Sequence, residues 1–380
     1  MNKIPPVDLT RQYKLISEEA DRAVLEILNS GSYIGGQAVA TFERQFADYT
    51  GVAECVSCNS GTDALYLALR ALNISEGDEV ITSPFTFFAT AEVISRVGAK
   101  PIFIDIDLDT FNFNLAQIEQ AITSKTKAII PVHLFGQPVN MTTVMAIART
   151  HNLTVIEDCA QATGASWNSQ KVGGIGHVGC FSFFPTKNLG ACGDGGAITT
   201  NDRALAKQMR ILKEHGSPER YRHDLIGINS RIDSVQAAIL TIKLRHLDFW
   251  NEQRQRAADY YHELLNTVSS IKLPQAIAKG NCVWNQYTIC VTRESSSTIH
   301  KQRRDAVKKY LQQQGIVSMI YYPIPLQLQP VYQNLGYKKG QLPIVEQAAR
   351  EVLSLPMFPG ISEAEQERVA YALKDCLIEI

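Results

Sequence analysis

The chain has 380 residues, of which 45% are hydrophobic and 20% are charged, and its formal net charge at pH 7 is -1. A chain of this length exceeds one ordinary hydrophobic core, and its balanced charge offers little to a polyanion, so we expect two domains and no nucleic-acid partner. The longest apolar runs are strand-sized and residues 1–6 lack the apolar core of a signal peptide, so we expect no membrane partner and a cytoplasmic location.

The eight cysteines are scattered through apolar segments, which is typical of buried, reduced thiols. Cys55 and Cys58 form a Cys-x-x-Cys pair, but no second pair exists, and residues three apart in a strand face opposite sides. We interpret the pair as structural. His177 and the other seven histidines show no ligand spacing, so we expect no metal site.

The first half of the chain predicts a helical arm followed by an α/β domain. Apolar residues recur at helical spacing in residues 11–29, before Gly31. From about residue 50 to 245, short β-branched runs alternate with helical stretches, which predicts a mostly parallel sheet covered by helices. The expected strands are residues 79–82, 101–106, 128–133, 154–157, 179–184 and 196–200.

The order of elements changes after residue 245, which predicts a large domain of residues 1–245 and a small α+β domain of residues 246–380. Residues 322–330 are rich in proline, which indicates a loop. The other expected elements are a helix at 251–265, a strand around Trp284, Tyr287, Ile289 and Val291, a helix at 298–314, a strand at 316–322, and helices near 343–354 and 362–376.

Two motifs in the large domain are candidates for ligand contacts. Gly61 and Thr62 follow a strand and open a helix at residues 64–72, where free N–H groups can bind phosphate; the alternative is an N-cap by Ser60 or Thr62. Residues 83–90 form an aromatic turn at a strand end, and we choose Phe87 to stack on a flat ring, although core packing is the alternative for most of these rings.

The next candidates are polar residues at and beyond a strand end. Asp158 could keep the pyridine nitrogen of an aromatic cofactor protonated, and the Gln161 amide could hydrogen-bond a phenolic oxygen on the same ring. Helix capping or an ion pair is the alternative role for Asp158. We interpret Glu157 as structural. Residues 174–179 match Gly-x-Gly-x-x-Gly but lead into a strand, so we reject dinucleotide binding.

Lys187 closes the apolar run that begins at Phe181. Burial favours the neutral amine of a lysine, and a neutral amine forms a Schiff base with an aldehyde. The commonest biological partner in that chemistry is pyridoxal phosphate, whose ring nitrogen pairs with an acidic residue. Lys187 with Asp158 therefore predicts a pyridoxal phosphate site.

Together these segments resemble the DegT/DnrJ/EryC1/StrS family of sugar aminotransferases, and the resemblance runs nearly from end to end. It is carried by Ser60-Gly61-Thr62, Thr86-Phe87, the motif at 131–136, Glu157-Asp158-Cys159-Ala160-Gln161, the motif at 181–190, Gly193-Asp194-Gly195-Gly196-Ala197, the motif at 227–231 with 236–238, and Tyr322-Pro323-Ile324-Pro325-Leu326. The resemblance implies fold type I of the pyridoxal phosphate enzymes, which is the aspartate aminotransferase-like fold.

The resemblance also implies roles for individual residues. Lys187 would hold the cofactor and act as general base, Asp158 would pair with its ring nitrogen and Gln161 with its phenolic oxygen, and Phe87 would stack on the ring. Gly61, Thr62 and Ser182 would bind its phosphate, with Asn229 of a second subunit reaching the same site in a homodimer. L-glutamate would convert the cofactor to pyridoxamine phosphate, which would aminate a nucleotide-linked keto sugar.

The substrate is expected from departures in two loops, where many relatives have histidine and this chain has Gln327 and Phe358. The first loop resembles enzymes that aminate C3 of a UDP-linked 2-acetamido sugar, notably the 3-keto glucuronate. Alternatives are a dTDP- or UDP-linked 4-keto-6-deoxy sugar, an inosose, or a noncatalytic cofactor-binding regulator. We expect substrate contacts from Tyr33, Ile34, Arg231, Tyr321 and Tyr322.

Overall fold

The computed structural model describes residues 3–292 and 297–379. Two helices, α1 (Leu9–Ser30) and α2 (Gly36–Thr50), come first, of which only the first was predicted. Asp8 caps α1 by accepting a hydrogen bond from the N–H of Thr10, and Gly31 ends the helix in the left-handed conformation, with φ of 68°. The buried face of α1 packs against α8 (Ser234–Leu244), so the predicted arm lies on the main body of the protein.

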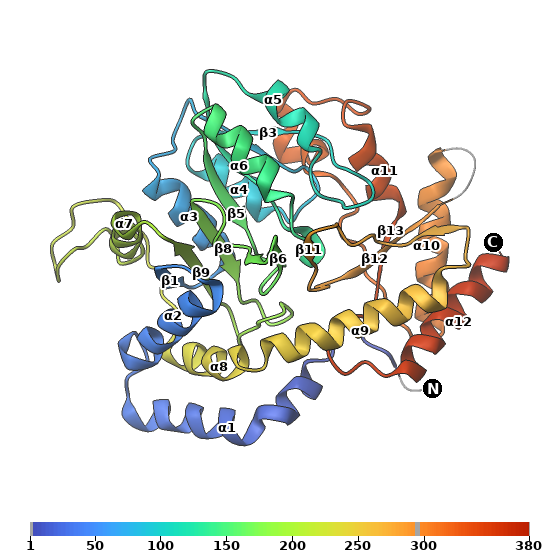
Figure 1. The fold of residues 1–380 in the computed structure, drawn as a ribbon, viewed down its shortest axis with the longest axis horizontal. Coiled ribbons are helices and arrows are strands. Elements are labelled where there is room, and N and C mark those ends of the chain that lie inside the picture. Colours follow the sequence, from blue (N-terminus) through green and yellow to red (C-terminus); the bar gives the residue numbers. More distant parts are fainter. Residues whose placement is uncertain (1–2, 293–296, 380) are drawn as a thin grey trace.

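A seven-stranded sheet forms the centre of the molecule, in the order β1-β9-β8-β5-β4-β2-β3 (Figure 1). The neighbours from β8 to β3 are parallel, whereas β9 is antiparallel to both of its neighbours. The mostly parallel sheet is therefore confirmed. Its strands are β1 (Glu54–Cys58), β2 (Glu79–Thr82), β3 (Lys100–Phe103), β4 (Thr126–Ile130), β5 (Thr154–Asp158), β8 (Val178–Ser182) and β9 (Gly196–Thr200).

Helices cover both faces of this sheet (Figure 1). One face packs on α3 (Gly61–Ala71), α4 (Ala89–Arg96) and α7 (Arg203–Lys213), and the other on α2, α8 and α6 (Met141–Thr150). Cys55 and Cys58 point into these two different cores, as expected for residues three apart in a strand. The eight cysteines form no disulfide within residues 3–292 and 297–379, and Cys192 is the exposed one.

A second, antiparallel sheet of three strands lies beside the first and contains β10 (Ile271–Lys272), β12 (Tyr287–Val291) and β13 (Val352–Leu355). Helix α9 (Leu247–Leu265) runs from α8 toward this sheet (Figure 1). The boundary at residues 245 and 246 stays a prediction. The remaining elements are η1 (Leu115–Gln117), α5 (Ile118–Ala121), η2 (Leu134–Gly136), β6 (Ser166–Trp167), β7 (Gln170–Lys171), β11 (Gly280–Asn281), α10 (Ser297–Gln313), η3 (Leu326–Leu328), η4 (Pro330–Leu335), α11 (Pro343–Glu351) and α12 (Glu363–Glu379).

Two expectations for the C-terminal third were wrong. Residues 316–322 form no strand, because Ile316 bridges to Ile4 and Met319 to Ser354, which are different partners, and no ladder is built. The helix expected at 343–354 stops at Glu351, because the next four residues are buried and pair with β12 as β13. The proline-rich segment is mostly a loop, as expected, but it contains one short 3₁₀ helix, Leu326–Leu328, and a second, Pro330–Leu335, begins at its last residue.

Within residues 3–292 and 297–379, no helix combines the length and the apolar character needed to cross a bilayer.

Candidate active site

Lys187 lies in the connection between β8 and β9, five residues beyond the end of β8. Its side chain is partly buried, and its backbone N–H donates to the carbonyl of Phe184 at 2.9 Å. Burial lowers the pKa of the amine to about 8, against the opposing effect of the Asp158 charge. At pH 7 about a tenth of such an amine is neutral, compared with less than about a thousandth for an ordinary lysine, so Lys187 can act as a base or nucleophile.

Asp158 is the last residue of β5 and is buried. Its carboxylate accepts hydrogen bonds from Thr90 Oγ1 at 2.8 Å and from the N–H of Ala160 at 3.1 Å. Burial raises the pKa of this carboxyl, whereas those two bonds and the Lys187 charge lower it, and the net direction is upward. A cation placed beside Asp158 would therefore help to keep it ionised.

The orientation of the Gln161 amide is set by the backbone beside it. Its Oε1 accepts a hydrogen bond from the N–H of Phe135 at 2.7 Å, so its Nε2 faces the other way and donates to the hydroxyl of Tyr322 at 3.0 Å. Phe135 has a φ of 58°, and Gly136 follows with a φ of 93°. A Cβ at Gly136 would lie 2.8 Å from the backbone nitrogen of Trp284, so this turn has little freedom to move.

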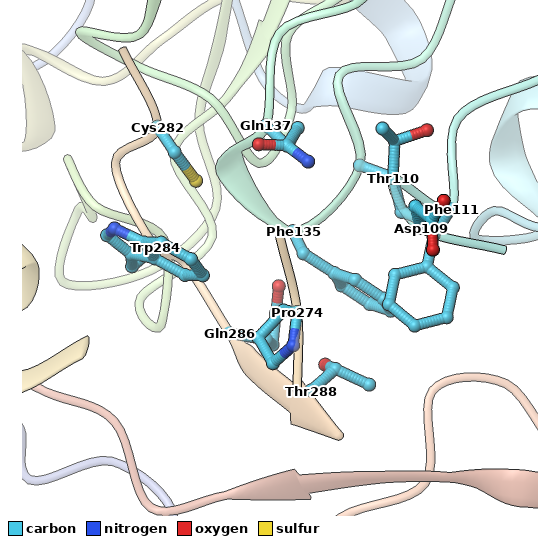
Figure 2. Close-up of a pocket in the computed structure, with 11 residues that line it drawn as sticks. Asp109, Thr110, Phe111, Phe135, Gln137, Pro274, Cys282, Trp284, Gln286 and Thr288 are labelled. Carbon is cyan, nitrogen blue, oxygen red and sulfur yellow. The ribbon is translucent and has the colours of Figure 1, made fainter. Parts of the chain in front are cut away.

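A small cavity lies next to the same turn (Figure 2). Phe135 extends toward Phe111, with 5.5 Å between their ring centroids, and Trp284 lies on the opposite wall (Figure 2). Neither Lys187 nor Asp158 lines this cavity, and its walls are mainly aromatic and aliphatic. It is therefore distinct from the polar cluster formed by these two residues.

The start of α3 meets the end of β8. Ser60 caps the helix by accepting a hydrogen bond from the N–H of Asp63 at 3.1 Å, while the first N–H groups, including those of Gly61 and Thr62, have no acceptor within the helix. A Cβ at Gly61 would lie 2.6 Å from Cβ of Ser182, which would close the space between the helix end and the strand. These groups could hold a phosphate.

The aromatic turn after β2 connects with Asp158. Phe87 is 59% exposed, so its ring is available to a ligand or a second subunit. The hydroxyls of Thr86 and Thr90 lie 3.0 Å apart, and Thr90 in turn binds Asp158. Thr90 was not singled out from the sequence, because nothing in its motif identifies the distant carboxylate as its partner.

Asn229 and Arg231 lie near the phosphate turn but outside the Lys187 cluster. Asn229 is exposed, and the next residue, Ser230, donates from its hydroxyl to Asn59 Oδ1 at 3.0 Å. Arg231 Nη1 lies 3.2 Å from a carboxylate oxygen of Glu214 in the same chain. Arg231 is thus engaged in an ion pair within its own chain.

The structure joins some predicted substrate residues to the cluster and leaves others apart. Tyr322 bonds Gln161, and its ring centroid lies 5.7 Å from that of Tyr321. Tyr33 and Ile34 are about half exposed and lie beside the start of α8, where the carbonyl of Tyr33 accepts a hydrogen bond from the N–H of Ser234 at 2.9 Å.

The two departures from the expected loops are both buried. Gln327 is 2% exposed, and neither its Oε1 nor its Nε2 has a hydrogen-bond partner among the described residues. The residue before it, Leu326, donates its N–H to the carbonyl of Pro84 at 2.9 Å, which holds this loop against the end of β2. Phe358 packs beneath Arg11, whose guanidinium lies 5.1 Å from the ring centroid.

Beneath Asp158 lies a buried pair that sequence reasoning missed. His133 Nδ1 accepts a hydrogen bond from the N–H of Val139, so its Nε2 carries the proton and donates to Glu157 at 3.0 Å. Glu157 also accepts from the N–H groups of Ile175 and Gly176 at 2.9 and 2.6 Å. The glycine-rich run at 174–179 therefore holds this carboxylate, and its likeness to a dinucleotide motif has no functional basis here.

These observations fit pyridoxal phosphate. The Gly61–Ser182 cradle suits a phosphate, an amine with a pKa of about 8 suits covalent attachment, and a buried carboxyl with a raised pKa suits a cationic ring nitrogen. Of the residues predicted from sequence, the structure thus brings together Lys187 with Asp158, Gln161 with Tyr322, and Gly61 with Ser182.

Comparisons with known proteins agree with this geometry. The sequence profile of the DegT/DnrJ/EryC1/StrS aminotransferase family matches residues 14–374. A protein of Geobacillus stearothermophilus named pleiotropic regulatory protein is 48% identical over 96% of both chains. The UDP-N-acetyl-3-dehydro-alpha-D-glucosamine 3-aminotransferase of Acidithiobacillus ferrooxidans is 46% identical over 98% of both chains. The crystal structure of DesV from S. venezuelae superposes with a TM-score of 0.94 at 38% identity, covering 99% of this chain and 98% of that one.

Proposed function

The chain belongs to the DegT/DnrJ/EryC1/StrS aminotransferase family and has its fold, and we propose that it transfers the amino group of L-glutamate to C3 of a UDP-linked 2-acetamido-3-keto sugar. Members of the family are pyridoxal phosphate-dependent aminotransferases that act on nucleotide sugars. The observation that carries the proposal is the polar cluster of Lys187 and Asp158, because it contains both the base and the carboxylate that transamination needs.

Pyridoxal phosphate, when bound, would supply an aldehyde for amine exchange and a ring that accepts electron density from the carbon losing a proton. The N–H groups of Gly61 and Thr62 and the hydroxyl of Ser182 would bind its phosphate. Asp158 would pair with the ring nitrogen, Gln161 would donate from Nε2 to the phenolic oxygen, and Phe87 would cover the ring. The half-buried hydroxyl of Tyr322 already occupies the position opposite Gln161 Nε2.

Lys187 would perform the proton transfer at its Nζ. A base works best when its pKa lies near the operating pH, and burial lowers the pKa of this amine to about 8. The neutral amine would take the proton from the α-carbon of L-glutamate, hold it at Nζ as ammonium, and give it up again later in the exchange of amino groups. The negative charge of Asp158 stabilises that ammonium.

Asp158 is held in place for its role by two donors. Thr90 Oγ1 and the N–H of Ala160 each occupy one carboxylate oxygen, at 2.8 and 3.1 Å. Both bonds favour the ionised form and offset part of the cost of burial. Thr90 would thus act through Asp158 as a positioning residue.

The homodimer is part of the proposal. Phe87, Phe184, Ile34 and Tyr33 are each at least half exposed, so their side chains are available to a second copy of the chain. We propose that a second copy covers these side chains and contributes its own Asn229, Tyr33 and Ile34 to the site. This would explain why these three residues lie outside the Lys187 cluster within one chain.

The choice of C3 and of UDP rests on sequence similarity and on the 321–327 loop. The relative with 46% identity is named for a 3-keto UDP-N-acetylglucosamine. Leu326 fastens the loop to the carbonyl of Pro84 at 2.9 Å, next to the aromatic turn, where Tyr321 and Tyr322 could contact the sugar. Arg231 would contact the diphosphate. The 3-keto glucuronate differs from that relative's sugar by a carboxylate at C6, and such a product would be used in surface polysaccharide or amino-sugar biosynthesis.

The test uses the purified protein in two stages. L-glutamate should bleach the visible absorption of the lysine-bound cofactor and release 2-oxoglutarate. The amino form is then mixed separately with 3-keto UDP-N-acetylglucosamine, the corresponding 3-keto glucuronate, dTDP- and UDP-linked 4-keto-6-deoxy sugars and an inosose, and the products are weighed by mass spectrometry. Amination of a 4-keto sugar or the inosose alone would overturn the proposed substrate, and absence of both stages would support a regulatory role.

A further inference from the structure

Asn188, the residue after Lys187, has a buried amide that bonds three residues in two other segments. It is 3% exposed. Its Nδ2 donates to Asn251 Oδ1 at 2.7 Å and to the carbonyl of Val283 at 2.8 Å, and its Oδ1 accepts from Asn285 Nδ2 at 2.8 Å. The connection that carries Lys187 is therefore tied to helix α9 and to the segment that precedes β12.

The direction of these amides is set by backbone carbonyls, which can only accept. The carbonyl of Val283 requires Nδ2 of Asn188 on its side, and the carbonyl of Thr163, 3.1 Å from Asn251 Nδ2, orients Asn251 in the same way. The result is a chain of donors that runs from Asn285 through Asn188 and Asn251 to Thr163. We call these three asparagines the amide chain.

The amide chain ends at a loop that belongs to the same site. Thr163 is buried and lies two residues beyond Gln161, in the loop that follows Asp158. The two loops that carry the proposed cofactor contacts are thus bridged through side chains of Asn188 and Asn251, over a separation of more than twenty residues in sequence.

The other end of the amide chain is held by a buried arginine. Arg254 on α9 is 1% exposed, and its Nη1 lies 3.1 Å from the carbonyl of Trp284 and 3.2 Å from that of Met357. In the described part of the chain it has no carboxylate partner, so these carbonyls provide its interactions. Asn285 Oδ1 is buried without a partner while its Nδ2 serves Asn188. Both arrangements cost stability.

We propose that Asn188 is a positioning residue that holds Lys187 in its buried place, and that the amide chain fixes the Lys187 loop relative to the Asp158–Thr163 loop. The inference rests on the proposed role of Lys187. Its physical basis is that three hydrogen bonds of normal length restrain the residue directly bonded to Lys187. Misplacing a reacting group by about 1 Å can cost about a hundredfold in rate.

The first test reads the Lys187 amine in the apoenzyme, where no substrate is needed. Competitive labelling with acetic anhydride over a pH series, followed by peptide mass spectrometry, gives the reactivity of each lysine. In Asn188→Ala the Lys187 loop becomes more solvated, so the neutral fraction of the amine should fall and labelling at pH 7 should drop at least about threefold. Gln366→Leu is the matched control, because it removes a buried amide that bonds the carbonyl of Ala257, which lies farther along α9 and outside the amide chain.

A second variant guards against misfolding. Asn251→Ala leaves Asn188 bonded to the carbonyl of Val283 but removes the hydrogen bonds that Asn251 makes with Asn188 and Thr163. It should therefore lower Lys187 labelling as well, by a smaller factor. Unchanged Lys187 labelling in every folded variant of Asn188 and Asn251 would overturn the inference, whatever the enzyme's substrate proves to be. A drop of equal size in Gln366→Leu would also overturn it, because the effect would then reflect general loosening.

The holoenzyme provides an independent readout with L-glutamate. Asn188→Ala should lower kcat at least about tenfold while KM for L-glutamate stays within about threefold, because substrate contacts are kept and the base is misplaced. A change confined to KM would overturn the positioning role. If neither the native enzyme nor any variant reacts with L-glutamate while the labelling shift is present, the proposed function fails and the positioning of Lys187 stands.

Discussion

Gly61→Ala should destabilise the apoenzyme through close contacts with Ser182, and a second substitution at Ser182 should relieve part of the loss. The added Cβ would lie 2.6 Å from Cβ of Ser182, a distance that real Cβ atoms do not show, and 3.1 Å from its Cα, which is a tight contact. Overpacking of this kind costs about 1–3 kcal/mol, and the loss of glycine's freedom in the unfolded chain returns about 0.4–1 kcal/mol. The expected net loss is therefore about 0.5–2 kcal/mol.

Ser182→Gly removes the contacts to Cβ at 2.6 Å and to Oγ at 3.2 Å and leaves the 3.1 Å contact to Cα, which a small shift can relieve. By itself it should cost about 0.5–1 kcal/mol, the usual penalty for glycine at a strand end. The double variant should then be less destabilised than the sum of the two single variants by at least about 0.5 kcal/mol.

The assay is urea unfolding of the four apoproteins at one protein concentration, followed by tryptophan fluorescence. A coupling of at least about 0.5 kcal/mol between the two positions supports the close approach of α3 to β8. Strictly additive losses would refute it. Phosphate-dependent stabilisation, measured in the same series, should be weaker in Gly61→Ala than in the native chain, because a displaced helix end loses the alignment of its first N–H groups.

Three further predictions concern charge and burial. The pKa of Lys187 is lowered to about 8 in the folded state, so the unfolded chain binds more protons between pH 8 and 10.5 and the apoenzyme gains stability over that range. Lys187→Met should therefore be more stable than the native apoenzyme at pH 7, and the difference in melting temperature should shrink toward pH 10.5. A difference that stays constant with pH would contradict this. Thr90→Val removes a bond that lowers the pKa of Asp158, so the acid limb of the kcat profile should move to higher pH, and an unmoved limb would argue against the role of Thr90. Glu157→Ala leaves three donors, His133 Nε2 and the N–H groups of Ile175 and Gly176, without their acceptor. It should lower the free energy of urea unfolding by at least about 3 kcal/mol, and a loss below about 1 kcal/mol would contradict the account of the His133–Glu157 pair.

Local patterns in the sequence were sufficient for the elements whose apolar period is clear. The strands at 79–82 and 196–200 are found with the predicted bounds, and the arm helix ends at Gly31 as expected. The predictions failed where pairing between distant strands decides the structure. Val352–Leu355 is a strand because it pairs with β12, whereas residues 316–322 form only isolated bridges and no ladder. Propensity is a weak guide where such pairing competes with it.

The sequence by itself was sufficient to identify the aminotransferase family of this protein, and it predicts Lys187, Asp158 and Gln161 as residues of the site. Only the tertiary structure decided how those side chains are held. Thr90 faces Asp158, Phe135 turns the Gln161 amide, and Asn188 fastens the Lys187 loop to α9. Each of these contacts joins residues far apart along the chain, and a hydrogen bond depends on distance and direction in space, which sequence spacing does not contain.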